Sequence, residues 1–267
     1  MRDSSNQKPP SPDVPSPFDN AELYDVLFAD LDFDRSFYLE LARAAHGAVL
    51  EVACGSGRIL IPCLQAGVKI EGIDNSRPML TALLRKAAGL GLQATVHHAD
   101  MRDFVLANRY DLVFIAFNGF VHALTTAEQL ETLQRCRHHL NTGGMLVFNV
   151  FYPGLEIIAG TEGVPVLEHE ALHPATGLPV RIYDTRTLNR VEQIQYSSIE
   201  IQELDAEGRV MASHRSETSM RWTFKPEMEL LLRASGFSRW QICGGFNRRP
   251  LEREDDLMVV FAWKDLE

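Results

Sequence analysis

Short strand-like segments alternate with longer helix-like segments along the middle of this chain. Each strand-like segment is rich in β-branched and apolar residues and precedes a stretch of helical character; the segments are 48–53, 68–74, 94–97, 111–117 and 145–151. This alternation is typical of a parallel sheet whose strands are joined by crossover helices. The chain has 267 residues, 45% of them apolar, which is enough to bury a sheet of this size. We therefore predict an α/β fold.

Helix boundary signals lie between these strands. Ser76 precedes Arg77 and Pro78, a sequence that predicts an N-cap and a first turn. Thr125 and Glu128 have the spacing of a capping box. Two further helices are expected before the first strand, between Phe18 and Gly47.

The alternation breaks after Phe151. Residues 165–224 contain long runs with a period of two, as in 180–183 and 194–201, and the sequence 205–208 is typical of a hairpin turn. We predict an antiparallel insertion of about four strands here. A helix from Pro226 and two last strands then return the chain to the main sheet.

Composition divides the chain further. Residues 1–17 are rich in proline and serine with little that is apolar, so we expect a disordered tail. The predicted main domain combines residues 18–151 with 226–267, and the insertion spans 152–225.

Charge and cysteine content exclude several functions. The formal net charge of -10 disfavours nucleic acid and anionic membrane surfaces as partners. No apolar run of about 18 residues predicts a membrane span, and the first residues lack the apolar core of a signal peptide, so we expect a cytoplasmic protein. The four cysteines contain no C-x-x-C pair, which argues against a zinc cluster or a disulfide framework.

The most informative segment runs from Val49 to Arg58. It predicts a strand that ends in a turn with Gly55 and Gly57 and continues into a helix, where a ligand can approach the backbone and free N–H groups. Asp74 ends the next strand, where a carboxylate can bind a ribose diol. Asp100 follows the third strand and is placed to accept a hydrogen bond from the amino group of an adenine.

Two residues argue against a nicotinamide dehydrogenase. The third glycine of G-x-G-x-x-G is replaced by Leu60, and the first strand carries the carboxylate of Glu51. A carboxylate would repel a pyrophosphate but attract an ammonium or sulfonium group. The alternative role of Glu51 is that of a carboxylate bound to a helix N-terminus, and the alternative role of Asp74 is that of an ordinary helix cap.

Together these motifs resemble the class I S-adenosylmethionine-dependent methyltransferases. The resemblance covers roughly residues 20–151 and is carried by Glu51 to Gly57, Gly72 to Asp74, Ala99 to Met101 and Leu140 to Gly144. It implies a Rossmann-like three-layer sandwich with a mostly parallel seven-stranded sheet and S-adenosylmethionine as cofactor. The residues expected around that cofactor are Tyr24, Glu51, Ala53, Cys54, Gly55, Ser56, Gly57, Asp74, Asn75, Met79, Asp100, Met101, Phe117 and Asn118.

Within this family the resemblance implies distinct roles. Glu51 and the loop 53–57 surround the methionine part, and Asp74 binds the ribose. Asp100 and Met101 hold the adenine, whereas Phe117 and Asn118 line the site near the reacting methyl group; Tyr24 is expected to close over the cofactor or to pack in the core.

The acceptor is less constrained than the cofactor. Asn118 is not followed by the Pro-Pro-aromatic run of DNA and RNA amino-methyltransferases, and no Asp ends the fourth strand as in metal-dependent catechol-type enzymes, so no metal is implied. His122, just beyond that strand, is the candidate for proton removal. Its alternative role is that of a loop histidine that shapes the pocket.

We predict methyl transfer to a small molecule, with an amine favoured over a hydroxyl. The insertion resembles, in place and size, the antiparallel lids with which glycine and amino-sugar N-methyltransferases cover or dimerise over their acceptor sites, so a homodimer is one expected assembly. Candidate acceptor-binding residues are Tyr152, Arg181, Tyr183, Arg221 and Arg248. The alternatives are a small-molecule O-methyltransferase with His122 as general base and a cofactor-binding protein without catalysis.

Overall fold

The computed structural model describes residues 9–11, 13–28, 31–152, 154, 158–160, 162–173, 176–253 and 256–265. The chain forms two compact units. As far as their residues are described, one comprises 32–155 and 222–267, and the other comprises 1–31 and 156–221. The larger unit contains the alternating strands and helices, and the smaller unit contains the insertion.

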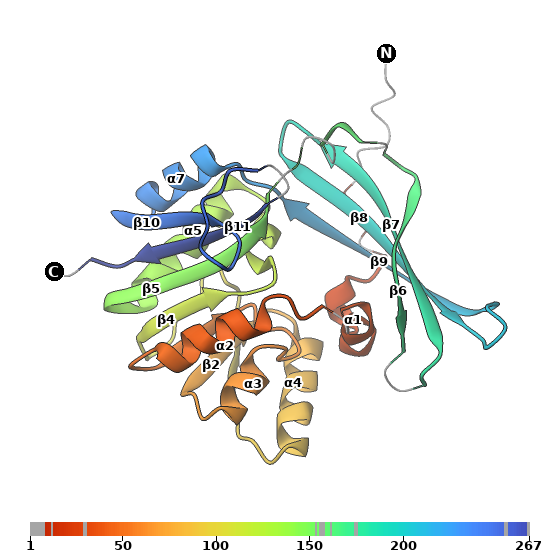
Figure 1. Cartoon of the computed structure of the whole chain (residues 1–267), viewed down its shortest axis with the longest axis horizontal. Helices are drawn as coiled ribbons and strands as arrows, with labels where there is room; N and C mark the ends of the chain where they lie inside the picture. Colours follow the sequence, from red (N-terminus) through yellow and green to blue (C-terminus); the bar gives the residue numbers. More distant parts are fainter. Residues whose placement is uncertain are drawn as a thin grey trace. The chain divides into compact units, whose positions relative to one another are not determined.

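A seven-stranded sheet forms the centre of the larger unit (Figure 1). Its strand order is β10-β11-β5-β4-β1-β2-β3. The strands are β1 (Val49–Val52), β2 (Ile70–Asp74), β3 (Thr95–His98), β4 (Tyr110–Ile115), β5 (Leu140–Phe151), β10 (Arg239–Gly244) and β11 (Leu257–Trp263). Strands β3, β2, β1, β4 and β5 pair in parallel, whereas β11 is antiparallel to both β5 and β10. The mostly parallel sheet predicted from the sequence is confirmed.

Helices cover both faces of this sheet, as Figure 1 shows. They are α2 (Arg35–Ala44), α3 (Leu60–Gln65), α4 (Arg77–Gly89), η3 (Gly119–His122), α5 (Thr126–His139) and α7 (Lys225–Ala234). Apolar residues of α2, α3 and α4 pack with those of the strands into one buried core, which includes Leu60, Leu83 and Phe114. Helices α5 and α7 contact each other on the opposite face.

The helix caps agree with the sequence signals. The Ser76 hydroxyl accepts a hydrogen bond from the Met79 N–H at the start of α4, and the Thr125 and Glu128 side chains form both hydrogen bonds of a capping box on α5. Strand β5 starts at Leu140, earlier than the expected start at Met145. Leu140 is extended, with ψ 142°, because it already pairs with Tyr110 of β4.

The smaller unit is built on a four-stranded antiparallel sheet with strand order β6-β7-β8-β9. The strands are β6 (Pro165–Leu172), β7 (Pro179–Asn189), β8 (Ile194–Leu204) and β9 (Val210–Arg221). The predicted hairpin turn joins β8 to β9, where Gly208 has a φ of 81° and donates its N–H to the Asp205 carbonyl. The antiparallel insertion is thereby confirmed.

Helix α1 (Ala21–Leu27) belongs to this smaller unit, whereas the sequence analysis grouped it with the main domain. The reason is its apolar face: Val26 and Leu27 pack against Val180, Ile182 and Ile201 of the antiparallel sheet.

The described end of the predicted tail also contacts this sheet. The Glu217 N–H of β9 donates to the Pro15 carbonyl at 3.0 Å, and the Ser11 N–H donates to the Glu217 carboxylate at 2.8 Å. Short helix η2 (Pro17–Asp19) follows, with its own capping box from Ser16. The remainder of the predicted tail, residues 1–8 and 12, lies outside the described residues.

Candidate active site

The carboxyl ends of β1, β2, β3 and β4 lie at one edge of the sheet because these strands run in parallel. Ligands of open α/β sheets bind at this edge. The topology therefore brings together the acidic residues Glu51, Asp74 and Asp100 and the polar Asn118, which the sequence analysis had selected from separate segments.

The loop after β1 has an unusual backbone. Ala53, Gly55 and Gly57 all have positive φ, at 57°, 53° and 88°. A Cβ at Gly57 would lie 2.8 Å from Leu83 Cγ, so this glycine is required by packing. A Cβ at Gly55 would meet nothing within 4 Å, so the backbone there has an open side that a ligand can approach.

Glu51 is the most unusual residue of the site. It is only 3% exposed, and its Oε2 atom has no hydrogen-bond partner among the described residues. Burial raises the pKa of the Glu51 carboxyl well above its ordinary value, although the positive charge of Arg58 opposes this shift. A cationic ligand beside Glu51 would favour the ionised form of this carboxyl and would give its second oxygen a partner.

A buried ion pair that the sequence analysis missed lies beside Glu51. Arg58 donates to both carboxylate oxygens of Asp34, at 2.5 and 2.8 Å, and Asp34 is fully buried. The Arg58 guanidinium also lies 4.4 Å from the ring centroid of Phe117. The Arg58 guanidinium thus holds the Phe117 ring at the end of β4, and the Asp34 carboxylate neutralises most of the positive charge of Arg58.

Asp74 ties the glycine loop to α4. Its Oδ2 accepts the Gly55 N–H and its Oδ1 accepts the Ser76 N–H, both at 2.8 Å. Burial raises the pKa of the Asp74 carboxyl, and these two hydrogen bonds oppose that shift. A carboxylate has about four acceptor positions, so Asp74 retains capacity for ligand hydroxyls. Of the neighbouring predicted residues, Asn75 is exposed and Met79 is buried in α4.

Asp100 has a strong partner within the protein. Arg102 donates through Nε and Nη2 to the two Asp100 oxygens, at 2.8 and 2.6 Å, and its backbone N–H donates at 2.9 Å. These bonds lower the pKa of the Asp100 carboxyl. Arg102 also pairs with Glu128, the residue of the α5 capping box. The expected contact between Asp100 and an adenine stays a prediction, as does that of the half-buried Met101.

The end of β4 carries consecutive residues in the left-handed region. Phe117 and Asn118 have φ values of 50° and 61°, a strained conformation for residues other than glycine. The buried Asn149 of β5 donates to the Asn118 side chain at 3.2 Å and accepts from the Tyr38 hydroxyl at 2.7 Å. This chain of hydrogen bonds fixes Asn118 at the strand end, and the sequence analysis did not identify Asn149.

His122 ends η3, directly after this strained turn, and is partly exposed. The other predicted cofactor residues of the β1 loop, Cys54 and Ser56, are buried. All four cysteines are buried and free, and burial raises the pKa of the Cys63 and Cys136 thiols to about 12.

The predicted acceptor residues are divided between the two units. In the smaller unit, Arg181 forms an ion pair with Glu170 at 2.8 Å, Tyr183 is half-buried and Arg221 is buried. In the larger unit, the Arg248 guanidinium lies 4.3 Å from the ring centroid of Phe261, and Tyr152 contacts the ring of Phe224 edge-on. An acceptor role for any of them stays a prediction.

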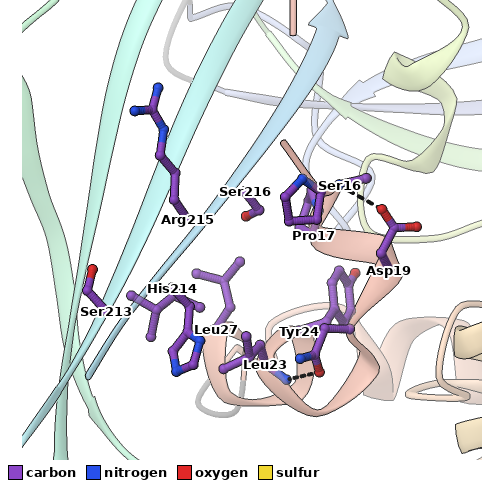
Figure 2. Close-up of a pocket in the computed structure, with 13 residues that line it drawn as sticks. Ser16, Pro17, Asp19, Leu23, Tyr24, Leu27, Ser213, His214, Arg215 and Ser216 are labelled. Atoms are coloured by element: carbon purple, nitrogen blue, oxygen red, sulfur yellow. Dashed lines mark hydrogen bonds between the residues drawn. The ribbon is translucent and has the colours of Figure 1, made fainter. Parts of the chain in front are cut away.

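Tyr24 lines a cavity of the smaller unit, shown in Figure 2. The cavity measures about 390 Å³, and side chains of α1 and the preceding segment face those of β9 across it. Tyr24 also contacts Phe28, with 4.7 Å between ring centroids. The expected closure of Tyr24 over the cofactor stays a prediction.

In the part of the chain that the structure describes, no three His, Cys, Asp or Glu residues are grouped so as to hold a metal ion. None of the helices described is both long and apolar enough to cross a membrane.

The strand order and the acidic, glycine-containing edge define the fold of the class I S-adenosylmethionine-dependent methyltransferases. Residues 49–144 match the family described as "Methyltransferase domain". This part of the chain is therefore similar to the methyltransferase domain of that family.

The chain is also similar to relatives whose names state an activity. The chain is 31% identical to the dTDP-3-amino-3,6-dideoxy-alpha-D-glucopyranose N,N-dimethyltransferase of Streptomyces fradiae, over 53% of this chain and 58% of that protein. It is 25% identical to the cypemycin N-terminal methyltransferase of a Streptomyces species, over 79% of this chain and 81% of that protein. The chain thus spans little more than half of the sugar methyltransferase but most of the cypemycin enzyme.

Solved structures share the complete architecture. The CcbJ methyltransferase of Streptomyces caelestis superposes with a TM-score of 0.77 at 22% identity, covering 94% of this chain and 99% of that one. DesVI of Streptomyces venezuelae gives a TM-score of 0.71 at 21% identity, covering 90% and 97%. At these identities the likeness establishes the fold alone.

Proposed function

We propose that this protein transfers a methyl group from S-adenosylmethionine to the nitrogen of an amine acceptor. The observation that carries the proposal is the buried Glu51 carboxyl group, one oxygen of which has no hydrogen-bond partner among the described residues, beside the open backbone at Gly55. This combination suits a cationic adenosyl amino acid and disfavours a pyrophosphate.

The site residues fit this cofactor. When bound, S-adenosylmethionine supplies a methyl group activated by attachment to a positively charged sulfur. Glu51 and the loop 53–57 would hold its amino acid part, and Asp74 has acceptor capacity for ribose hydroxyls. Asp100 and Met101 would hold the adenine, with Arg102 keeping the Asp100 carboxylate ionised and oriented.

The protein's part in the reaction is mainly to position the reactants. An amine in its neutral form carries its own lone pair, so orientation and the exclusion of water account for much of the rate enhancement. The strained turn at Phe117 and Asn118 is held by Arg58 and Asn149, which makes it a rigid wall near the reacting group. His122 then shapes the pocket without being needed as a strong base.

The names of the relatives support an amine acceptor. Besides the amino-sugar and cypemycin enzymes, a glycine/sarcosine N-methyltransferase of Aphanothece halophytica is 28% identical over 39% of this chain. An amino-sugar nucleotide is the first candidate acceptor. A peptide N-terminal amine is the second, because the cypemycin enzyme matches the greatest share of the chain among these relatives. A homodimer, a cytoplasmic location and the absence of nucleic-acid partners stay predictions.

The test begins with calorimetric titration of the purified protein with S-adenosylmethionine and, separately, with NAD. We expect heat of binding from the first only; binding of NAD in its place would contradict the proposal. Release of S-adenosylhomocysteine is then measured with dTDP-3-amino-3,6-dideoxy-α-D-glucopyranose, a peptide with a free N-terminus and dTDP-6-deoxyglucose. We expect turnover of an amine and none of the hydroxyl compound. Cofactor binding without turnover across this panel would indicate a non-catalytic protein.

The variant His122→Ala separates N- from O-methylation. With an amine acceptor we expect kcat to fall by less than roughly tenfold, because removing a general base costs about 10²–10⁴-fold only where proton removal limits the reaction. The exposed His46 provides the control variant, His46→Ala, which should retain full activity. A near-complete loss of turnover in His122→Ala alone would favour the O-methyltransferase with His122 as base.

A further inference from the structure

A chain of three hydrogen-bonded side chains runs from the core of the larger unit to the carboxyl end of β4. Tyr38 of α2 is fully buried, and its ring stacks on that of Phe114. Its hydroxyl lies 2.7 Å from Asn149 Oδ1, and Asn149 Nδ2 lies 3.2 Å from Asn118 Oδ1. Asn149 is fully buried, whereas Asn118 is half-buried. The chain of hydrogen bonds therefore ends at a side chain that solvent reaches.

The buried end of this chain of hydrogen bonds decides how both amide groups are oriented. The Tyr38 phenol keeps its proton, because burial raises its pKa well above the ordinary value. Two oxygens lie within reach of this single donor, Asn149 Oδ1 at 2.7 Å and the Ile115 carbonyl at 3.3 Å. The shorter distance is the usual one for an O–H···O hydrogen bond, so Tyr38 donates to Asn149 Oδ1. The Asn149 amide must then direct its nitrogen toward Asn118.

Asn118 consequently accepts through its oxygen and keeps its amide nitrogen as a donor. In the part of the chain that the structure describes, the hydrogen bond from Asn149 is the only one that the Asn118 side chain makes. The turn that carries Asn118 lies against the loop after β1, because a Cβ at Gly119 would be 3.2 Å from Ala53 Cβ. The free N–H group is thus held at the edge of the sheet where the cofactor is expected, within the larger unit.

We propose that Tyr38 and Asn149 are positioning residues that present the Asn118 amide nitrogen to an oxygen of the acceptor, one carbon away from the carbon that carries the amine. This inference rests on the proposed N-methyltransferase function, in which Asn118 lies near the reacting methyl group. An N–H donor is not attracted to a sulfonium or an ammonium cation, so its partner there is a hydroxyl or carbonyl oxygen.

Both candidate acceptors carry such an oxygen. Hydroxyl groups flank the amine of dTDP-3-amino-3,6-dideoxy-α-D-glucopyranose, and the first carbonyl group of a peptide follows its N-terminal amine. Asn118 would therefore favour amines with a neighbouring oxygen over simple amines.

The test compares Tyr38→Phe with wild type and with Tyr110→Phe. Tyr38→Phe removes the donor that orients Asn149 and keeps the ring in the core. Tyr110 is also fully buried but lies at the amino end of β4, so Tyr110→Phe removes a phenol hydroxyl from the end of the strand opposite to Asn118. Asn118→Gly removes the proposed donor itself, because glycine adopts a φ of 61° without strain. Circular dichroism and thermal melting verify that each variant is folded.

Each protein is assayed with an acceptor and with the matching compound that lacks the neighbouring oxygen. The sugar series is dTDP-3-amino-3,6-dideoxy-α-D-glucopyranose and its counterparts without the 4-hydroxyl or without the 2-hydroxyl. The peptide pair is a peptide with a free N-terminus and the same peptide with its first carbonyl reduced to a methylene group. Release of S-adenosylhomocysteine gives kcat and KM, and calorimetry gives the affinity for S-adenosylmethionine. Because the same compounds are compared in every protein, differences in the basicity of their amines cancel.

We expect wild type and Tyr110→Phe to prefer the complete acceptor by roughly three- to tenfold in KM, the effect of one neutral hydrogen bond. In Tyr38→Phe and Asn118→Gly this preference should fall below about twofold, while the affinity for S-adenosylmethionine should stay within about twofold of wild type. A merely structural role of Tyr38 would lower stability or kcat for both compounds equally and would leave the preference unchanged. Should Tyr38→Phe fail to fold, Asn149→Leu replaces it, since leucine fills a similar volume and cannot orient Asn118.

An unchanged preference in Asn118→Gly or in Tyr38→Phe would overturn this inference alone, as would a wild type that methylates an amine without any preference for the neighbouring oxygen. Weaker binding of S-adenosylmethionine by Asn118→Gly with an unchanged preference would also overturn it, because the amide nitrogen would then serve the cofactor. If wild type binds S-adenosylmethionine but methylates neither amine, the inference and the proposed function both fail.

Discussion

At the scale of single residues, Glu51 couples the site to stability. Burial raises the pKa of the Glu51 carboxyl in the folded state above the ordinary value of about 4.3, which applies to the unfolded chain. At pH values between the unfolded-state pKa and the folded-state pKa, folding therefore takes up a proton. The contribution of Glu51 to the free energy of unfolding is fully present below a pH of about 4.3 and is lost as the pH rises toward the folded-state pKa. We expect wild type to lose up to about 1.4 kcal/mol per pH unit relative to Glu51→Gln over that interval.

The measurement is chemical denaturation of both proteins without ligand between pH 4.5 and pH 8. Glu40→Gln, a change at an exposed position of α2, is the control and should track wild type at every pH. If the difference in the free energy of unfolding between wild type and Glu51→Gln did not change with pH, Glu51 would not have a raised pKa in the folded protein. In the same variant we expect at least roughly tenfold weaker binding of S-adenosylmethionine, which calorimetry measures.

Substitutions at the two loop glycines should have different effects, one mainly on stability and the other mainly on cofactor binding. Gly57→Ala places a Cβ 2.8 Å from Leu83 in a left-handed conformation, so we expect a loss of about 2–4 kcal/mol of stability. Gly55→Ala meets no neighbouring atom and should cost only about 1 kcal/mol. Its methyl group occupies the open side of the loop, so we expect it to weaken cofactor binding measured by calorimetry. If Gly55→Ala bound the cofactor as wild type does, the ligand would have to approach elsewhere.

At the scale of elements, the capping box of α5 also supports the site. Glu128 accepts the N–H groups of Leu124 and Thr125 through one oxygen and pairs with Arg102 through the other. Thr125→Ala removes the hydroxyl that accepts the Glu128 N–H, and we expect a loss of about 1 kcal/mol in urea denaturation. Thr126→Ala, at the next position, which is also exposed, should change stability by less than about 0.5 kcal/mol. Equal effects of the two changes would argue against the cap.

At the scale of the whole molecule, the two units should differ in local stability. Among the described residues, one buried core cluster of the larger unit spans α2, α3, α4 and the central strands, whereas the cluster of the smaller unit includes only α1 and a few positions of β6, β7 and β8. Backbone amides exchange with solvent more slowly where more apolar surface is buried. We expect hydrogen–deuterium exchange mass spectrometry to find β1 and β4 more protected than β6 and β9. Uniform protection would instead indicate that both units open as one.

Sequence alone determined the features that depend on neighbours along the chain. The strand and helix alternation, the caps at Ser76 and Thr125, the hairpin at Gly208 and the glycine loop all arise from local periodicity or backbone conformation. Their spacing is visible in a single sequence because the interacting residues lie within a few positions of one another.

The tertiary structure decided the contacts between residues far apart in the chain. The pairing of Arg58 with Asp34, the hydrogen bond of Asn149 to Asn118 and the grouping of α1 with the insertion link segments that no local pattern connects. Asp184 belongs here too, since only the folded sheet directs Arg186 and Ser197 to one of its oxygens and leaves the other without a hydrogen-bond partner in the part of the chain that is described. Periodicity places a residue on a face of its strand or helix, but packing selects its partners.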